Sequence, residues 1–151
     1  TTGKLVISYK WDDAIDFNEG FAAVKKDDKW GFVNTSGKLV IPCEWSMGAI
    51  WSRSGFVDGL ACVIKDSKYG FIDTNANLVI PYEWNDAYSF NEGFAVVGKG
   101  SIFSEKYGLI DTTGKLVVPC EYDSVAYTDG RIFKIKNGYL TIEDLDGNRV
   151  F

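Results

Sequence analysis

The chain has 151 residues, of which 46% are hydrophobic and 15% aromatic, and its formal net charge is −5. This hydrophobic content is well above that of disordered chains and predicts a folded protein. The negative charge is unfavourable for nucleic-acid binding, which normally needs a basic surface. No apolar run approaches the length of a membrane-spanning helix, so neither a nucleic-acid partner nor a membrane span is expected.

The composition favours short strands. Sixteen glycines against 3 prolines, together with the many aromatic residues, are typical of strands joined by tight turns. No stretch has the 3.6-residue periodicity of a helix, so the predicted fold class is all-β. Three cysteines, Cys43, Cys62 and Cys120, lack CxxC spacing and are expected to be free, packed thiols.

One segment recurs four times along the chain. Its best copies read Gly-Lys-Leu-Val-Ile-Pro-Cys-Glu-Trp at 37–45 and Gly-Lys-Leu-Val-Val-Pro-Cys-Glu-Tyr at 114–122, and related copies occupy 3–11 and 76–84. The copies begin 34, 39 and 38 residues apart, and all three prolines fall at one repeat position. This regularity predicts a single tandem-repeat domain over residues 1–151. Its approximate units are 3–36, 37–75, 76–113 and 114–151, the last one degenerate.

Two further blocks recur in phase with the first. One block has an acidic residue and glycine before an apolar run, with copies at 19–24, 58–63, 92–97 and 129–133. The other reads Lys-Trp-Gly or Lys-Tyr-Gly, with copies at 29–33, 68–72 and 106–110 and a degenerate one at 138–142. In this order the three blocks resemble the bacterial WG-repeat (KWG) family over essentially the whole chain. The departures are tyrosines at 69 and 107, Ala76 at the turn glycine and the eroded last unit.

Within one repeat, the residues between 20 and 45 predict a three-stranded antiparallel meander. Strands are expected at 21–26, 30–34 and 38–41, joined by turns at 27–28 and 34–37. Pro42 is expected to end the third strand because it lacks a backbone N–H donor. The acidic and aromatic link that follows has room for a short fourth strand.

The turn between the second and third strands keeps the same chemistry in each unit. Its copies at 34–37, 73–76 and 111–114 begin with Asn or Asp, as is typical of a type I turn followed by a bulge glycine. Where Ala76 replaces this glycine, Asn75 is expected to take the left-handed conformation. Hydrogen bonds to backbone N–H groups explain Asn34, Asp73 and Asp111 better than calcium binding does.

A single meander cannot bury enough apolar surface to be stable, so the units must stack on one another. The recurring tryptophans are therefore expected in the core between units, and the glycine after each Trp or Tyr is expected where the backbone approaches closely. The stack is either an open, solenoid-like array or a closed four-bladed propeller. The resemblance favours the open array, because WG-repeat arrays vary in repeat number.

The chain lacks the usual equipment of an enzyme. It contains no histidine, which removes the commonest general base and metal ligand, and no phosphate-binding loop precedes a helix. The repeated carboxylates Glu44, Glu83 and Glu121 occupy equivalent positions, whereas a glycosidase needs two opposed carboxylates in different environments. We therefore expect no catalytic residue, no cofactor and no metal, with a carboxylate-dependent hydrolase as the least favoured reading.

Two insertions break the repeat and mark a candidate binding face. The first lies between Trp45 and Gly59 and contains Trp51 and Arg53, and the second extends the 93–107 segment and contains Phe103. Insertions in repeat proteins form surface loops and often carry binding residues. An accessible aromatic ring near an arginine suits a peptide or a sugar ring, so Trp51, Arg53 and Phe103 are the predicted ligand-binding residues.

The preferred reading of function is a non-enzymatic binding module with a protein or carbohydrate ligand. The family resemblance implies a bacterial origin and an interaction role, but it implies no particular ligand or catalytic residue. The alternative is a purely structural spacer or docking scaffold, which the two insertions disfavour because a spacer gains nothing from breaking its own period. The start at Thr1-Thr2-Gly3 is typical of a processed or truncated product, so the missing signal sequence does not decide the localisation. A secreted or cell-surface location in a bacterium stays open, as does the oligomeric state.

Overall fold

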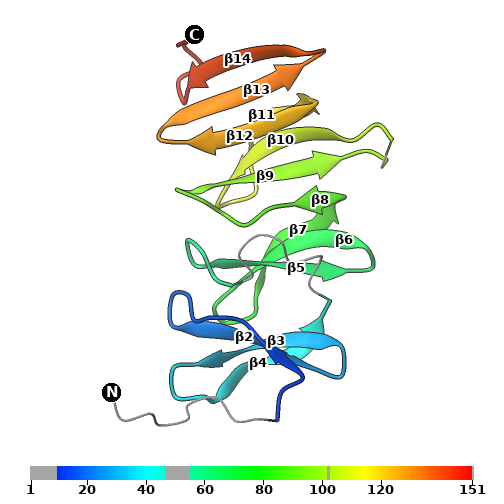
Figure 1. The fold of residues 1–151 in the computed structure, drawn as a ribbon, viewed down its shortest axis with the longest axis vertical. Helices are drawn as coiled ribbons and strands as arrows, with labels where there is room; N and C mark the ends of the chain where they lie inside the picture. The colour runs from blue at the N-terminus through cyan, green and yellow to red at the C-terminus, as the bar shows by residue number, and fades with distance from the viewer. Residues whose placement is uncertain (1–9, 47–54, 102, 151) are drawn as a thin grey trace.

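The structure, a computed structural model, describes residues 10–46, 55–101 and 103–150. These residues form antiparallel β-strands and contain no helix, as the sequence predicts. None of their elements is a long apolar helix of the kind that crosses a membrane. The strands form four separate sheets stacked along the long axis of the molecule, with the N-terminus at one end and the C-terminus at the other (Figure 1). The array is open, which excludes the propeller alternative.

Each sheet is a meander whose hydrogen-bonded neighbours are also neighbours in sequence. The first sheet comprises β1 (Asp13–Ala14), β2 (Phe21–Lys26), β3 (Lys29–Asn34) and β4 (Leu39–Trp45). The second comprises β5 (Leu60–Lys65), β6 (Lys68–Asp73) and β7 (Leu78–Trp84). The third comprises β8 (Asp86–Ala87), β9 (Phe94–Lys99), β10 (Lys106–Asp111) and β11 (Leu116–Tyr122), and the fourth comprises β12 (Ser124–Thr128), β13 (Arg131–Lys136) and β14 (Tyr139–Asp144). The short strands β1 and β8 are the fourth strands expected in the links.

The turns between second and third strands confirm the predicted type. The N–H of Gly37 donates to the carbonyl of Asn34 at 2.8 Å, and Gly37 has a φ of 78°. The Asn34 side chain accepts from the N–H groups of Ser36 and Lys38, each at 3.1 Å. The expectation for the second sheet was wrong: Ala76 itself has a φ of 65°, so it takes the glycine's place and Asn75 does not.

Pro42 does not end the third strand, contrary to expectation, because β4 continues from Leu39 to Trp45. This strand lies at the edge of its sheet, where a missing N–H breaks no pairing. Its register against β3 shifts, so that Trp30 pairs with Trp45 but Phe32 pairs with Ile41. The extra residues on β4 form a bulge opposite the glycine of the Trp-Gly block.

The hydrophobic core lies between successive sheets. Trp30 is 6% exposed and belongs to the cluster that joins the first and second sheets, whereas Tyr69 and Tyr107 are only partly buried at the next two junctions. Trp84 is 1% exposed, and Trp11 and Trp45 pack against core clusters while partly buried. The recurring aromatics therefore pack in or against the core, as expected, but with unequal burial.

One aromatic ring fills each of the first two junctions. Phe56 is fully buried, and its ring centroid lies 4.9 Å from that of Phe21 and 4.7 Å from that of Phe32, both in the first sheet. Phe90 takes the same place above the second sheet, 4.9 Å from the ring of Phe71. Both phenylalanines stand three residues before a turn glycine, so the repeat itself positions them.

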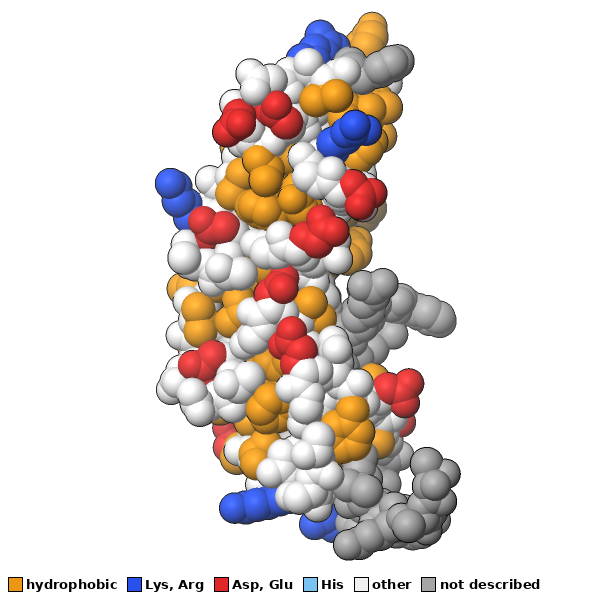
Figure 2. All heavy atoms as spheres, turned by 90° about the vertical axis from the view of Figure 1, so that its left-hand side faces the viewer, with side chains coloured by type: hydrophobic (Ala, Val, Ile, Leu, Met, Phe, Trp, Pro, Cys, Tyr) orange, Lys and Arg blue, Asp and Glu red, His pale blue; other side chains and the backbone are white. Residues whose placement is uncertain are grey.

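Carboxylates tie the acidic-glycine turns of neighbouring sheets together. The Glu19 carboxylate accepts hydrogen bonds from the N–H groups of Asp58 and Gly59, each at 2.9 Å. The Asp58 carboxylate in turn accepts from the N–H of Gly93 at 2.8 Å. These turns lie on one side of the stack, and Figure 2 shows acidic side chains spread along that face.

Candidate binding site

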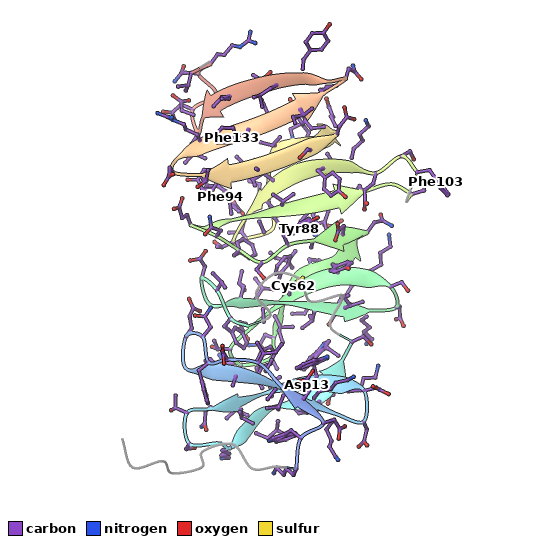
Figure 3. The ribbon with its side chains drawn as sticks, in the orientation of Figure 1. Asp13, Cys62, Tyr88, Phe94, Phe103 and Phe133 are labelled. Atoms are coloured by element: carbon purple, nitrogen blue, oxygen red, sulfur yellow. The ribbon has the colours of Figure 1, made fainter. Side chains whose placement is uncertain are left out.

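Of the three predicted binding residues, only Phe103 lies within the described residues. Its side chain is 96% exposed at the end of the long hairpin between β9 and β10, where it projects from the side of the stack (Figure 3). Trp51 and Arg53 lie outside the described residues. Whether the two insertions share a face is therefore a prediction that stays open.

A pocket of about 450 Å³ lies at the junction between the third and fourth sheets. It opens beside the core cluster that joins these two sheets, so its inner wall is apolar. Three tyrosines provide most of its aromatic surface, and one of them, Tyr88, is 45% exposed. The residues that line it are Tyr88, Val96, Tyr107, Ser124, Val125, Ala126 and Tyr127.

Three local changes in the repeat accompany the pocket. The residue three before the turn glycine is Tyr127 here, where the second and third sheets have Phe56 and Phe90. The link is also one residue shorter, since Tyr122 lies eight positions before Gly130 whereas Trp84 lies nine before Gly93.

The third change lies on the facing sheet. Leu109 stands at the position of Phe32 and Phe71 and has a smaller side chain than either. The ring of Tyr127 packs against Phe94 at 4.7 Å between centroids and remains partly exposed. Tyr127 therefore keeps the ring contact that Phe56 makes with Phe21, but it faces Leu109 where Phe56 faces Phe32.

Two carboxylates lie beside the tyrosines. Glu105, in the insertion before β10, accepts a hydrogen bond from the hydroxyl of Tyr107 at 3.1 Å. Gly98 makes room for this carboxylate, because a Cβ there would lie 2.8 Å from Glu105 Oε1 and 3.1 Å from the Cβ of Asp86. Glu105 and Asp86 therefore lie on either side of Gly98, next to the tyrosine wall.

The tyrosine pKa values report this environment. Burial, followed by the hydrogen bond to Glu105 and the charge of that carboxylate, raises the pKa of Tyr107 to about 12. Burial and then the charge of Asp86 raise the pKa of Tyr88 above its ordinary value. Both hydroxyls stay protonated at neutral pH in a locally negative pocket.

The pocket offers aromatic faces and hydroxyls, and two carboxylates that do not line it lie next to its tyrosines. None of the described ion pairs includes Asp86 or Glu105. Among the described residues there is also no group of three or more Cys, Asp or Glu side chains that would hold a metal ion. The chemistry available is therefore stacking, hydrogen bonding and attraction of positive charge.

Reasoning from the sequence did not identify Tyr88, Tyr127 or Glu105. The signals were present in part: the link before Gly130 is short, and Glu105 belongs to the insertion in which only Phe103 was singled out. What the sequence does not display is that residues 88, 107 and 127 converge across a junction between two sheets.

Comparisons with known proteins agree with this architecture. The family model described as "WG containing repeat" matches residues 1–30, 30–69, 69–101 and 107–139. The crystal structure of the computationally designed Ika4 protein has a similar fold, with a TM-score of 0.53 and 12% sequence identity over 94% of this chain and 98% of that chain. The comparison with curated proteins found no match. With the repeat model matched four times along its length, the chain belongs to the WG-repeat family.

Proposed function

We propose that this repeat array is a non-enzymatic binding module whose ligand site is the tyrosine pocket between the third and fourth sheets. The pocket itself carries the proposal. Phe56 and Phe90 are buried at the first two junctions, whereas the third has a pocket of about 450 Å³ beside the exposed ring of Tyr88. Pockets that combine apolar walls with a few polar groups are the usual form of a ligand site. A protein side chain or a sugar ring fits these dimensions.

The proposal that the module is non-enzymatic rests on the side chains the chain offers. It has no histidine, and desolvation raises the pKa of the Cys62 thiol to about 12, so that thiol is a poor nucleophile. Asp73 and Asp111 accept hydrogen bonds from backbone N–H groups of their own turns, which occupies them structurally. A carboxylate-dependent hydrolase would need Asp86 and Glu105 as an opposed acid and base. Glu105 instead accepts a hydrogen bond from the Tyr107 hydroxyl and Asp86 accepts one from the N–H of Ala87, which is unfavourable for that role.

A structural spacer is the alternative. The buried rings of Phe56 and Phe90 at the first two junctions favour it for that half of the array. A spacer would gain nothing from the tyrosine-lined pocket at the third junction. The two functions therefore predict different roles for Tyr88, whose ring contributes to the pocket and is 45% exposed. In a binding module this ring contacts the ligand, and in a spacer it contacts none.

The test is a binding screen of the parent chain against immobilised peptides and oligosaccharides, repeated with Tyr88→Ala. Truncating an anchoring ring is expected to weaken binding at least about tenfold. Tyr139→Ala is the matched control, because Tyr139 is 80% exposed on β14 and does not line the pocket. Loss of binding with the first variant alone supports the site. Equal binding by parent and Tyr88→Ala, or no binding by the parent, contradicts it.

A further inference from the structure

We infer that the pocket takes a positively charged side chain from a basic segment of a protein partner, an inference that rests on the proposed function of the same site. The site joins two features that each attract a cation. One is the set of tyrosine rings, and the other is a pair of carboxylates without a described cationic partner.

Contacts between a cation and an aromatic ring already occur within this chain. Lys99 Nζ lies 4.4 Å from the ring centroid of Trp84, and Lys134 Nζ lies 5.1 Å from that of Tyr122. Both rings end third strands of their sheets, and both therefore already have an ammonium group from this chain. No described lysine or arginine takes the corresponding place over the rings of Tyr88, Tyr107 or Tyr127. Of the three, the ring of Tyr88 is the most exposed, at 45%, and is the one best placed to meet a cation from outside.

The carboxylates near this junction differ in whether a described lysine pairs with them. Around this junction Glu83 pairs with Lys99, Asp123 with Lys106 and Glu121 with Lys136. Asp86 and Glu105 enter none of the described ion pairs, although both lie close enough to the tyrosines to raise the pKa of Tyr88 and Tyr107. Among the described residues no cation pairs with these two carboxylates beside the pocket, and partial burial strengthens their field.

A neutral sugar would use the same rings and oxygens, but charge separates the two ligands. The whole chain carries −5, and two carboxylates without a described cationic partner lie beside the pocket's aromatic wall. A sugar gains hydrogen bonds from these carboxylates but no charge compensation. An ammonium or guanidinium group gains both, so the geometry favours the cation.

The experiment is an NMR titration of the 151-residue chain with labelled tyrosine rings. The probe is an acetylated and amidated Gly-Gly-Lys-Gly-Gly peptide, compared with the same peptide carrying Nε-acetyl-lysine. The charged peptide is expected to shift the Tyr88 and Tyr127 ring signals, and the neutral one is expected to bind at least about threefold more weakly. Equal binding of the two peptides overturns the inference.

Two variants test whether binding of the charged peptide depends on the carboxylate of Glu105. Glu105→Gln keeps an acceptor for the Tyr107 hydroxyl but removes the charge, so it should weaken binding of the charged peptide. Glu121→Gln is the control, because it removes the same charge from a surface carboxylate that already pairs with Lys136, whereas Glu105 contacts the pocket residue Tyr107. Full binding by Glu105→Gln, or equal weakening by both variants, overturns the inference.

A neutral oligosaccharide, chitotriose, separates this inference from the proposed function. If chitotriose shifts the Tyr88 ring while the charged peptide does not, the binding module stands and its cationic ligand is rejected. If neither probe shifts the ring and the screen above also finds no ligand, both proposals fail.

Discussion

Ala76 shows how one residue can depart from the repeat while the backbone does not. Its φ is 65°, close to the 78° and 84° of Gly37 and Gly114 at the same turn position. An L-residue pays about 1 kcal/mol or more for this conformation, which glycine adopts freely. The turn hydrogen bonds of Asp73 persist nonetheless, so the neighbouring residues impose the conformation on Ala76.

Replacing Ala76 with glycine should therefore stabilise the chain. We expect Ala76→Gly to raise the free energy of unfolding by about 0.5–1 kcal/mol, because relief of strain outweighs the loss of one methyl contact with the core. The converse change, Gly114→Ala, should destabilise, since its Cβ would lie 3.2 Å from Ile80 at a φ of 84°. Urea midpoints measure both changes, and a lower midpoint for Ala76→Gly would contradict the strain argument.

Tyr107 predicts how stability responds to alkaline pH. Its folded-state pKa is about 12, against an ordinary value of 10.0, with burial as the first cause and Glu105 as the second. Because the folded state holds the proton more tightly, the stabilisation is complete below pH 10 and is lost as the pH rises toward 12.

The measurement is an ultraviolet titration of tyrosinate absorbance alongside urea unfolding at several pH values. Tyr107→Phe should remove one late-titrating tyrosine and flatten the loss of stability in this range. The exposed residue Tyr139 supplies the control, Tyr139→Phe, which should leave that late step in place. An unchanged late step in Tyr107→Phe would show that another tyrosine is responsible.

At the scale of elements, the bulge in the third strand explains why the Trp-Gly block needs its glycine. A Cβ at Gly31 would lie 2.5 Å from the carbonyl oxygen of Ile41 and 2.7 Å from Pro42. Gly70 and Gly108 face the equivalent carbonyls at 2.8 and 2.5 Å. The proline of one block and the glycine of another therefore take part in the same contact. The strand that carries the proline bulges toward the strand that carries the glycine.

This contact predicts a large cost for a small substitution. Gly31→Ala should lower the free energy of unfolding by about 1–3 kcal/mol, because the clash is with backbone that cannot rotate away. Gly55→Ala is the matched control: its Cβ would meet only the Asn18 side chain at 3.5 Å, an ordinary contact. Thermal or urea unfolding compares them, and equal stability of the two variants would mean that the bulge adapts at little cost.

Much of each element could be predicted from the sequence, because turn residues carry local information. Asn34 and Asp111 predicted the turns, and the recurring blocks between the turns predicted the strands. The continuation of β4 through Pro42 could not be predicted, since a strand at a sheet edge has the same sequence pattern as a central one. The candidate site was predicted only in part. Tyr127 visibly replaces the phenylalanine of the other repeats, but the sequence does not show that it meets Tyr88 across two sheets.

At the scale of the whole molecule, the packing of the array is uneven along its length. Each of the first two junctions buries large rings, Phe56 and Phe90 among them. The third buries Leu109, Val118, Val125 and Ile132 and contains the pocket. Beyond it, Leu140, the second residue of β14, is 51% exposed, although Trp30, the second residue of β3, is 6% exposed. By strand pairing the last copy therefore lies one residue later than the sequence alignment placed it. In a linear array each sheet is stabilised only by its neighbours, so the fourth sheet should be the least stable.

Hydrogen exchange tests this gradient, with β14 amides expected to exchange fastest and β3 and β6 amides slowest. Two matched core truncations sharpen the test. Ile72→Ala removes a side chain shared by the first and second sheets and should lower protection on both sides of that junction by about 2–5 kcal/mol.

Ile132→Ala makes the same truncation where the third and fourth sheets meet, and its effect should be confined to the fourth sheet and the adjoining strands of the third. Because the tyrosine pocket lies at this junction, opening of the fourth sheet would also remove the pocket. A ligand bound there should therefore slow exchange in β12 and β13 selectively. Uniform exchange in all four sheets, unchanged in pattern by either truncation, would mean that the array unfolds as one cooperative unit.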